Sequence, residues 1–295
     1  MNRPYIRTRA TVTTIGIDLL IALVPAVAWA VFSRGAGAAG IIAASLAGAC
    51  AADAVFDLCR KKLPGFELLC APLIGIVTGL CLPHDAPVWL AASAGLAAEL
   101  IFGRLADLTG RRFINPTAAA ICLVLLIFGG MLSKDQNAVI AGLGPKHLDF
   151  GVQTLITPNN AALGTAPAAV LIGLAYLLIR RVISIHIPLA FMLTFGVLTM
   201  LFTSNPTDAD APVFALSQML SGTVLLGAVL VAPMYASSPA SAGGRLLFGI
   251  GCGALTFLFR HMGATGALSE GTMFAIVCMN IFVPLIERVA YRRKK

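Results

Sequence analysis

Ten apolar stretches, separated mostly by short polar segments, run along the 295-residue chain. Stretches of this kind are typical of helices that cross a bilayer, for which about 20 apolar residues suffice. The pattern therefore predicts an all-α integral membrane protein with ten transmembrane helices. The predicted spans cover residues 15–32, 38–58, 66–83, 87–102, 115–131, 168–179, 185–202, 213–231, 245–259 and 271–286.

The longest break in the apolar pattern is Ser133–Pro167, with five predicted spans before it and five after it. We expect one integral membrane domain with three parts. These parts are a first five-span repeat at 1–133, an external loop at 134–167 and a second five-span repeat at 168–295.

Charge placement fixes the expected orientation. Charged residues make up only 12% of the chain, against roughly 25% in soluble domains, which excludes a soluble fold. With ten spans and a cytoplasmic N-terminus, 17 of the 21 Lys and Arg residues fall in cytoplasmic segments. The other four are Arg34, Lys134, Lys146 and Arg260. This split predicts a cell inner (plasma) membrane protein with both termini in the cytoplasm, and it explains the net charge of +8 without nucleic acid.

An internal repeat is visible in the sequence. The segment that begins Asn115-Pro-Thr and opens the fifth span resembles the segment that begins Glu270-Gly-Thr and opens the tenth. Spans three and eight carry Gly75–Gly79 and Ser221–Thr223, and each ends at a proline. Because five is odd, the second copy must be inverted in the membrane, an arrangement that often has broken helices around a central binding region. The small residues alternatively serve close helix packing.

Few residues in the spans suggest chemistry. The five acidic residues near span ends are either interfacial or paired, or they take part in cation passage, for which Asp18 and Glu99 are the best candidates. The seven cysteines and four histidines lack metal-ligand spacing, so we predict no metal site and no stand-alone catalytic residue. The acidic residues in question are Asp18, Asp53, Asp57, Glu67 and Glu99.

Three stretches resemble the RnfD/NqrB family, and RnfD in particular by length. They are Arg3–Arg9 continuing into Asp18–Pro25, Phe113–Pro116, and Glu270–Glu287. The resemblance implies a flavin-binding membrane subunit of an ion-translocating electron transport complex, which relays electrons coupled to Na⁺ or H⁺ movement. It implies other membrane subunits as partners, including an external FMN subunit and iron–sulfur subunits.

The resemblance also implies cofactor positions. Family members attach FMN by a phosphoester to a threonine in a Ser-Gly-Ala-Thr motif, and they are associated with a second, non-covalent flavin such as riboflavin. Here Thr154-Leu-Ile-Thr157 replaces that motif, so Thr157 is the candidate FMN attachment residue. Leu155 and Ile156 would crowd a flavin transferase, so we rank non-covalent flavin between the repeats above covalent FMN.

Two alternatives stay open. A transporter or channel could use the same ten-span inverted-repeat fold without redox activity. The chain could also be a structural subunit that has lost its cofactor.

Overall fold

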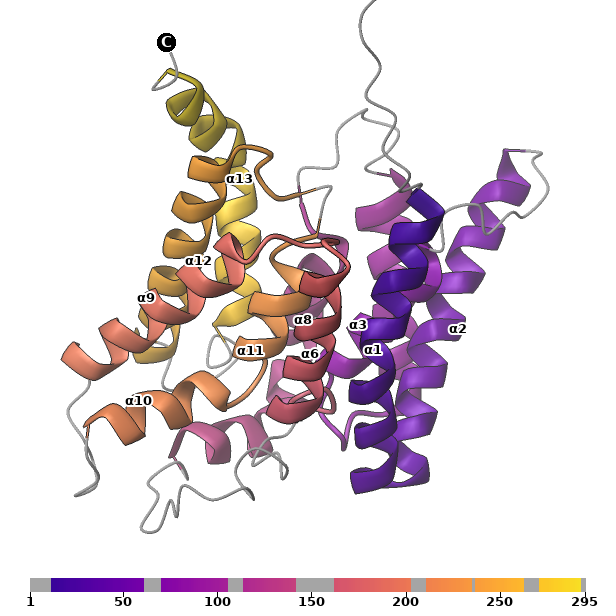
Figure 1. Cartoon of the computed structure of the whole chain (residues 1–295). Helices are drawn as coiled ribbons and strands as arrows, with labels where there is room; N and C mark the ends of the chain where they lie inside the picture. Colours follow the sequence, from indigo (N-terminus) through magenta and orange to yellow (C-terminus); the bar gives the residue numbers. More distant parts are fainter. Residues whose placement is uncertain are drawn as a thin grey trace, which may run out of the picture.

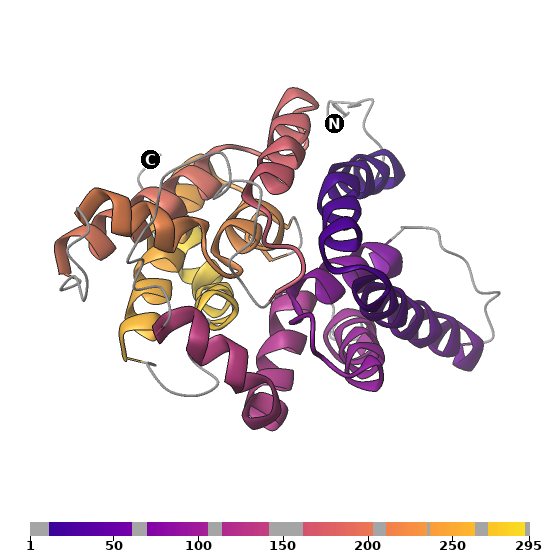
Figure 2. The ribbon, with the colours of Figure 1, turned by 90° about the horizontal axis from the view of Figure 1, so that it is seen from below.

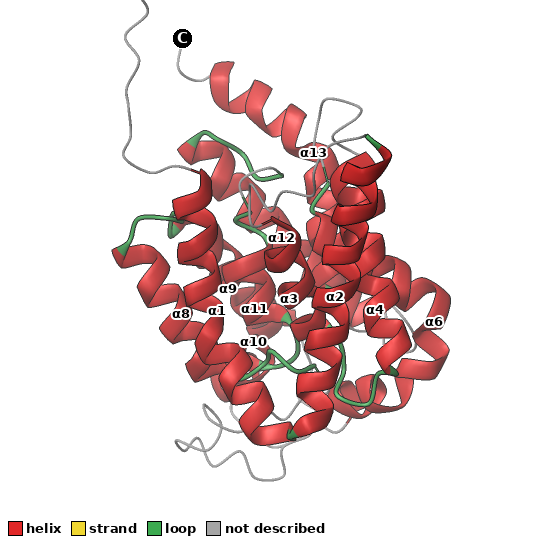
Figure 3. Cartoon of the chain, turned by 90° about the vertical axis from the view of Figure 1, so that its right-hand side faces the viewer, coloured by secondary structure: helices red, strands yellow, loops and turns green. Residues whose placement is uncertain are grey.

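The computed structural model describes residues 12–60, 70–105, 114–141, 162–202, 211–234, 237–262 and 271–292. The regular elements within these residues are all helices, with no strand among them (Figure 3). The helices are α1 (Val12–Arg34), α2 (Ala36–Cys59), α3 (Cys70–Cys81), α4 (Val88–Ala97), η1 (Ala98–Arg104), α6 (Pro116–Ala141), α8 (Pro167–Ile179), α9 (His186–Phe202), α10 (Ala211–Leu220), α11 (Val224–Leu226), η2 (Gly227–Val231), α12 (Ala242–Met262) and α13 (Thr272–Arg292). The all-α prediction is confirmed, and each predicted span contains helix.

The lengths of the helices mark a multi-pass membrane protein. Four of them, α1, α2, α12 and α13, are long and apolar enough to cross a bilayer, and the bent pair formed by α10 and α11–η2 would make a fifth. Large apolar side chains such as Leu126, Ile172 and Leu201 are exposed on the outer surface, where lipid would cover them. Four shorter apolar helices lie among the described residues, so the count of ten crossings stays a prediction.

The first half of the chain packs through glycines. A Cβ at Gly95 of α4 would collide with the backbone of Ser45 in α2, and a Cβ at Gly48 would collide with the carbonyl of Ala92. The Ser45 hydroxyl donates to the carbonyl of Gly75 in α3 at 2.8 Å. Helices α2, α3 and α4 can approach this closely because these positions lack large side chains.

The second half packs in a similar way. Cβ atoms at Gly249 and Gly253 of α12 would press on the backbone of α9 at Ile187 and Phe191. Helix α13 packs against α12 as well. Viewed along the helices, the indigo-to-purple helices of the first half and the orange-to-yellow helices of the second form two neighbouring groups (Figure 2).

Helices of the first half pack against helices of the second. Helix α1 packs against α8, and α6 packs against α13 (Figure 1). One continuous hydrophobic core runs through both groups and includes Leu23, Leu80, Ile187 and Met273. The two groups of helices therefore bury their apolar side chains against each other.

The two small-residue interruptions turn out differently. In the eighth predicted span, Ser221–Thr223 separates α10 from α11, and the two arms are bent by 63°. Gly222 has φ +60°, a conformation that glycine adopts without strain. In the third span, however, α3 is continuous through Gly75–Gly79. Of the two interpretations that the sequence left open, close packing applies here, because both glycines face α2.

The fifth span also differs from the prediction. Helix α6 continues to Ala141, past the predicted start of the external loop at residue 134. The extension consists of residues that a helix tolerates, and no glycine or proline occurs in it before Gly142. Polarity alone therefore set the predicted boundary too early.

Candidate functional site

The junction between the two halves is centred on Asn115, which is fully buried. Its Oδ1 accepts a hydrogen bond from the Ala118 backbone at 3.2 Å, and Pro116 follows at the first helical position, so Asn115 is the N-cap of α6. Its Nδ2 donates to the carbonyl of Val231, the last residue of η2, at 2.7 Å. The sulfur of Met234 lies 3.1 Å from the same nitrogen. One side chain thus starts the fifth predicted span and holds the end of the eighth.

The chain that returns from the central loop is fixed to the end of α3. The backbone N–H of Leu163 donates to Leu82 at 3.0 Å, and that of Gly164 donates to Leu80 at 2.8 Å. A Cβ at Gly164 would clash with the side chain of Leu226 in α11. The segment that leads into α8 is therefore held between α3 of the first half and α11 of the second.

Two buried threonines lie on helices of this junction. Thr78 in α3 and Thr117 in α6 are both completely buried, and these helices pack side by side. Neither hydroxyl has a hydrogen-bond partner in the part of the chain that the structure describes. By contrast, Thr199 and Thr256 donate to carbonyls four residues earlier in their own helices, each at 2.8 Å. An unpaired buried hydroxyl costs about 1–3 kcal/mol, so Thr78 and Thr117 are suited to meet a polar ligand.

Arg260 of α12 caps the end of α10 at the break in the eighth span. Its guanidinium donates to the carbonyls of Gln218 and Ser221, both at 3.3 Å, and to the Ser221 hydroxyl at 3.2 Å. It also lies 5.5 Å from the centroid of the Phe195 ring. The carbonyls at the end of α10 have lost their helical partners, and a cation is the natural cap for them. Sequence reasoning counted Arg260 only as an external basic residue and missed this role.

The buried carboxylate of Asp18 is paired. It accepts a hydrogen bond from the Tyr176 hydroxyl at 2.9 Å and two from Arg180, at 3.2 and 3.3 Å. The pair links α1 to α8. Pairing explains how a carboxylate is tolerated there, which agrees with one of the two interpretations that the sequence left open.

A second acidic cluster joins α2 to η1. Arg104 contacts the carboxylate of Asp53, and its Nε lies 3.2 Å from Glu99 Oε1. Asp53 and Glu99 are both buried. Because Arg104 reaches both carboxylates, ionic contacts account for the burial of both acids.

The candidate attachment residue Thr157 lies outside the described residues, as do Thr154 and Glu67. Among the residues that are described, no group of three or more His, Cys, Asp or Glu side chains could hold a metal ion.

Helical architecture, lipid-facing apolar surface and a junction between two helix groups define a multi-pass membrane protein. The chain belongs to the NQR2, RnfD, RnfE family, which it matches over residues 1–295. This confirms the resemblance seen in the sequence.

Several relatives match over nearly their full length. The chain is 30% identical to the D subunit of the Na(+)-translocating ferredoxin:NAD(+) oxidoreductase complex of Acetobacterium woodii, over 99% of this chain and 93% of that protein. It is also 30% identical to the D subunit of the ion-translocating oxidoreductase complex of Stutzerimonas stutzeri, over 97% and 92%. A proton-translocating counterpart from Clostridium ljungdahlii is 24% identical over 97% and 92%. The relatives thus include proteins named for either ion.

Proposed function

We propose that this chain is the D-type membrane subunit of an ion-translocating ferredoxin:NAD⁺ oxidoreductase complex. The support is a match to two D-type subunits of ion-translocating oxidoreductases at 30% identity over nearly the whole chain. The partners are then the other subunits of the complex, including an external FMN subunit. Relatives named for Na⁺ and for protons both match, so similarity does not choose the ion.

The chain is proposed to hold a non-covalent flavin at the junction of the two halves. The observation that carries this is the pair of unpartnered, fully buried hydroxyls of Thr78 and Thr117 in the described part of the chain. A flavin ring offers carbonyl and ring-nitrogen acceptors along one edge, and two hydroxyl donors on adjacent helices suit such an edge. When bound, the flavin supplies the capacity to accept and pass on electrons.

The protein's own contribution is positioning. The Asn115 side chain accepts a hydrogen bond from the Ala118 N–H and donates one to the Val231 carbonyl. It therefore fixes where α6 begins relative to η2. Since α6 carries Thr117, the same link holds that hydroxyl in place. Both threonines are shielded from solvent.

Covalent FMN at Thr157 is the second flavin site that we propose to test. Thr157 has the hydroxyl that a phosphoester needs, and Pro158 follows it. Leu155 and Ile156 replace the small residues of the related motif. For this reason we rank covalent attachment second to non-covalent binding.

One observation favours a second candidate function, a transporter or channel without redox activity. The 63° bend between α10 and α11–η2 resembles the discontinuous helices that bind solutes or ions in transporters. Arg260 donates to the carbonyls of Gln218 and Ser221 on the α10 side of the bend. Flavin content separates this candidate from the redox function.

The decisive experiment measures flavin in this chain purified without its partner subunits, after denaturation and chromatography. A Thr78→Val, Thr117→Val double variant should lose most of the flavin that is released without covalent attachment. The matched control is Thr199→Val, Thr256→Val, which removes hydroxyls already bonded within their helices and should leave flavin unchanged. A wild-type chain without flavin, or equal flavin in both double variants, would reject the proposed site.

Covalent flavin is read separately from fluorescence of the denatured band, with the flavin transferase co-expressed. A fluorescent band that is lost in Thr157→Ala supports the attachment. A dark band in the wild type rejects covalent FMN but leaves the non-covalent site intact.

A further inference from the structure

A pocket of about 330 Å³ lies between the α8–α9 connection and the segment that leads from η2 to α12. Its apolar lining comes from the buried residues Val182, Ile183, Ile187 and Pro233. The volume is at the lower end of ligand pockets. By the charge count of the sequence, both connections belong to the cytoplasmic end of the protein.

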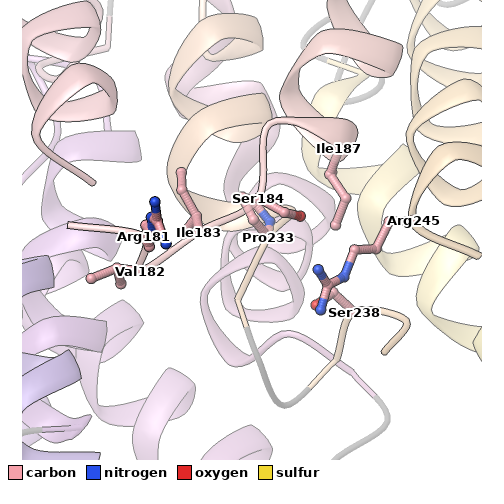
Figure 4. A pocket seen from close by; sticks show the side chains of 8 residues that line it. All are labelled: Arg181, Val182, Ile183, Ser184, Ile187, Pro233, Ser238 and Arg245. Atoms are coloured by element: carbon pink, nitrogen blue, oxygen red, sulfur yellow. The ribbon is translucent and has the colours of Figure 1, made fainter. Parts of the chain in front are cut away.

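The remaining lining of the pocket is cationic and rich in hydrogen-bond donors. Arg181 and Arg245 approach it from opposite sides, and Ser184 and Ser238 add hydroxyl groups (Figure 4). The Nε of Arg245 donates a hydrogen bond to the carbonyl of Pro239, at 3.1 Å. Within the described residues, no carboxylate forms an ion pair with either arginine.

The acidic residue that contacts the segment leading into α12, Glu287, forms its hydrogen bonds with the backbone of that segment. Glu287 of α13 accepts hydrogen bonds from the backbone N–H groups of Ala240, at 2.7 Å, and Ser241, at 3.1 Å. Its carboxylate therefore holds the connection to α12 in place. The positive charge of the two arginines is left for a ligand.

The backbone conformation of Arg181 is a second, independent indication of a binding site. Arg181 has φ 56°, and it is the one non-glycine residue with a positive φ in the described chain. Its N–H bonds to Leu178, and the N–H of Val182 bonds to Leu177. This is the helix-ending arrangement in which glycine is the usual residue, because a Cβ strains the left-handed conformation. An arginine here accepts that strain, and strained residues cluster at binding sites.

We propose that this pocket binds a phosphate group, and that in the membrane the group is the headgroup of an anionic phospholipid. A guanidinium matches two phosphate oxygens at once, and basic pockets at the cytoplasmic ends of membrane helices suit anionic headgroups. The flanking apolar side chains of Ile179, Ile185 and Leu189 are exposed, where acyl chains would cover them. This inference does not depend on flavin.

The test uses the purified full-length protein after removal of lipid, with thermal unfolding and native mass spectrometry as measurements. Phosphatidylglycerol should bind and raise the unfolding temperature, whereas phosphatidylcholine should not. Arg181→Gly and Arg245→Gln should each weaken phosphatidylglycerol binding roughly tenfold, since each removes a charged donor group. Arg288→Gln, on the exposed cytoplasmic end of α13, is the matched control and should bind like the wild type.

Arg181→Gly also separates binding from folding. Glycine suits the left-handed backbone, so without lipid this variant should unfold at the wild-type temperature or above. Equal binding of the two lipids by the wild type, or unchanged phosphatidylglycerol binding in both arginine variants, overturns the proposal. If inorganic phosphate alone raises the unfolding temperature and phosphatidylglycerol adds nothing, the phosphate pocket stands and the lipid assignment is overturned.

Discussion

At the residue scale, Asn115 makes two structural hydrogen bonds with one side chain. It caps α6 through Ala118 and bonds the far end of η2 through Val231. Asn115→Ala should lower the free energy of unfolding by about 2–4 kcal/mol, because a cap is lost and a buried carbonyl is left without a donor. Asn115→Ser keeps a capping oxygen and should recover about 1 kcal/mol of that loss. Equal stability of wild type and Asn115→Ala in detergent would contradict the link.

The unpartnered threonine hydroxyls predict that their removal stabilises the protein. In flavin-free protein, Thr78→Val should raise the free energy of unfolding by about 1 kcal/mol, because an isosteric apolar group replaces an unsatisfied hydroxyl. The same change at Thr199 removes an existing hydrogen bond to Phe195 and should not stabilise. Denaturant unfolding of the two variants side by side measures the difference. Stabilisation by both, or by neither, would mean that Thr78 is not set apart from Thr199.

Much of this residue-level detail could not be read from the sequence. The motif at Asn115 was recognisable, but its partner Val231 is 116 positions away along the chain, and no local pattern connects them. For Arg181, Arg245 and Arg260, the sequence predicted only the side of the membrane on which they lie. Their contacts depend on how helices pack, which hydropathy does not encode.

At the element scale, periodicity and hydropathy located helix in all ten stretches, because burial or lipid contact demands long apolar runs. The small-residue interruptions were ambiguous. Glycine permits a left-handed turn, as at Gly222, and it equally permits close packing, as at Gly75 and Gly79. Only the neighbouring helix decides between the two, so the sequence left both interpretations open for each span.

Close packing of α2 against α4 offers a test with a control in the same pair of helices. A Cβ at Gly95 would collide with the carbonyl of Ser45, whereas a Cβ at Gly40 of α2 meets nothing within 4 Å. Gly95→Ala should destabilise the protein by about 1–3 kcal/mol or more, as overpacking does. Gly40→Ala should stabilise it by up to about 1 kcal/mol, through helix propensity. Thermal unfolding that shifts in the same direction for both variants would refute this packing.

At the scale of the whole molecule, helices of equal rank in the two halves pack in corresponding ways. Helices α2 and α4 form a close pair in the first half, and α9 and α12, the matching spans, form one in the second. Across the halves, α1 meets α8 and α6 meets α13, which pairs span one with six and span five with ten. A two-fold relation between inverted repeats produces contacts of this kind. On this basis we propose that the halves are inverted repeats, and superposing them after a half-turn about an axis in the membrane plane tests the proposal.

The orientation of the whole molecule is the last prediction. Helix α1 begins and α13 ends at the same, upper end of the molecule in Figure 1, as an even number of crossings requires. If the chain crosses the membrane ten times, 17 of its 21 basic residues fall on one side, and that side should be the cytoplasm. A topology reporter fused after Lys146 should then behave as external, and one fused after Lys295 as internal. A fusion after Lys62 supplies an internal reference from the first half. Loss or gain of one crossing between Lys62 and Lys146 would reverse both Lys146 and Lys295 relative to Lys62, and a change after Lys146 would reverse Lys295 alone. Either reversal would reject ten spans.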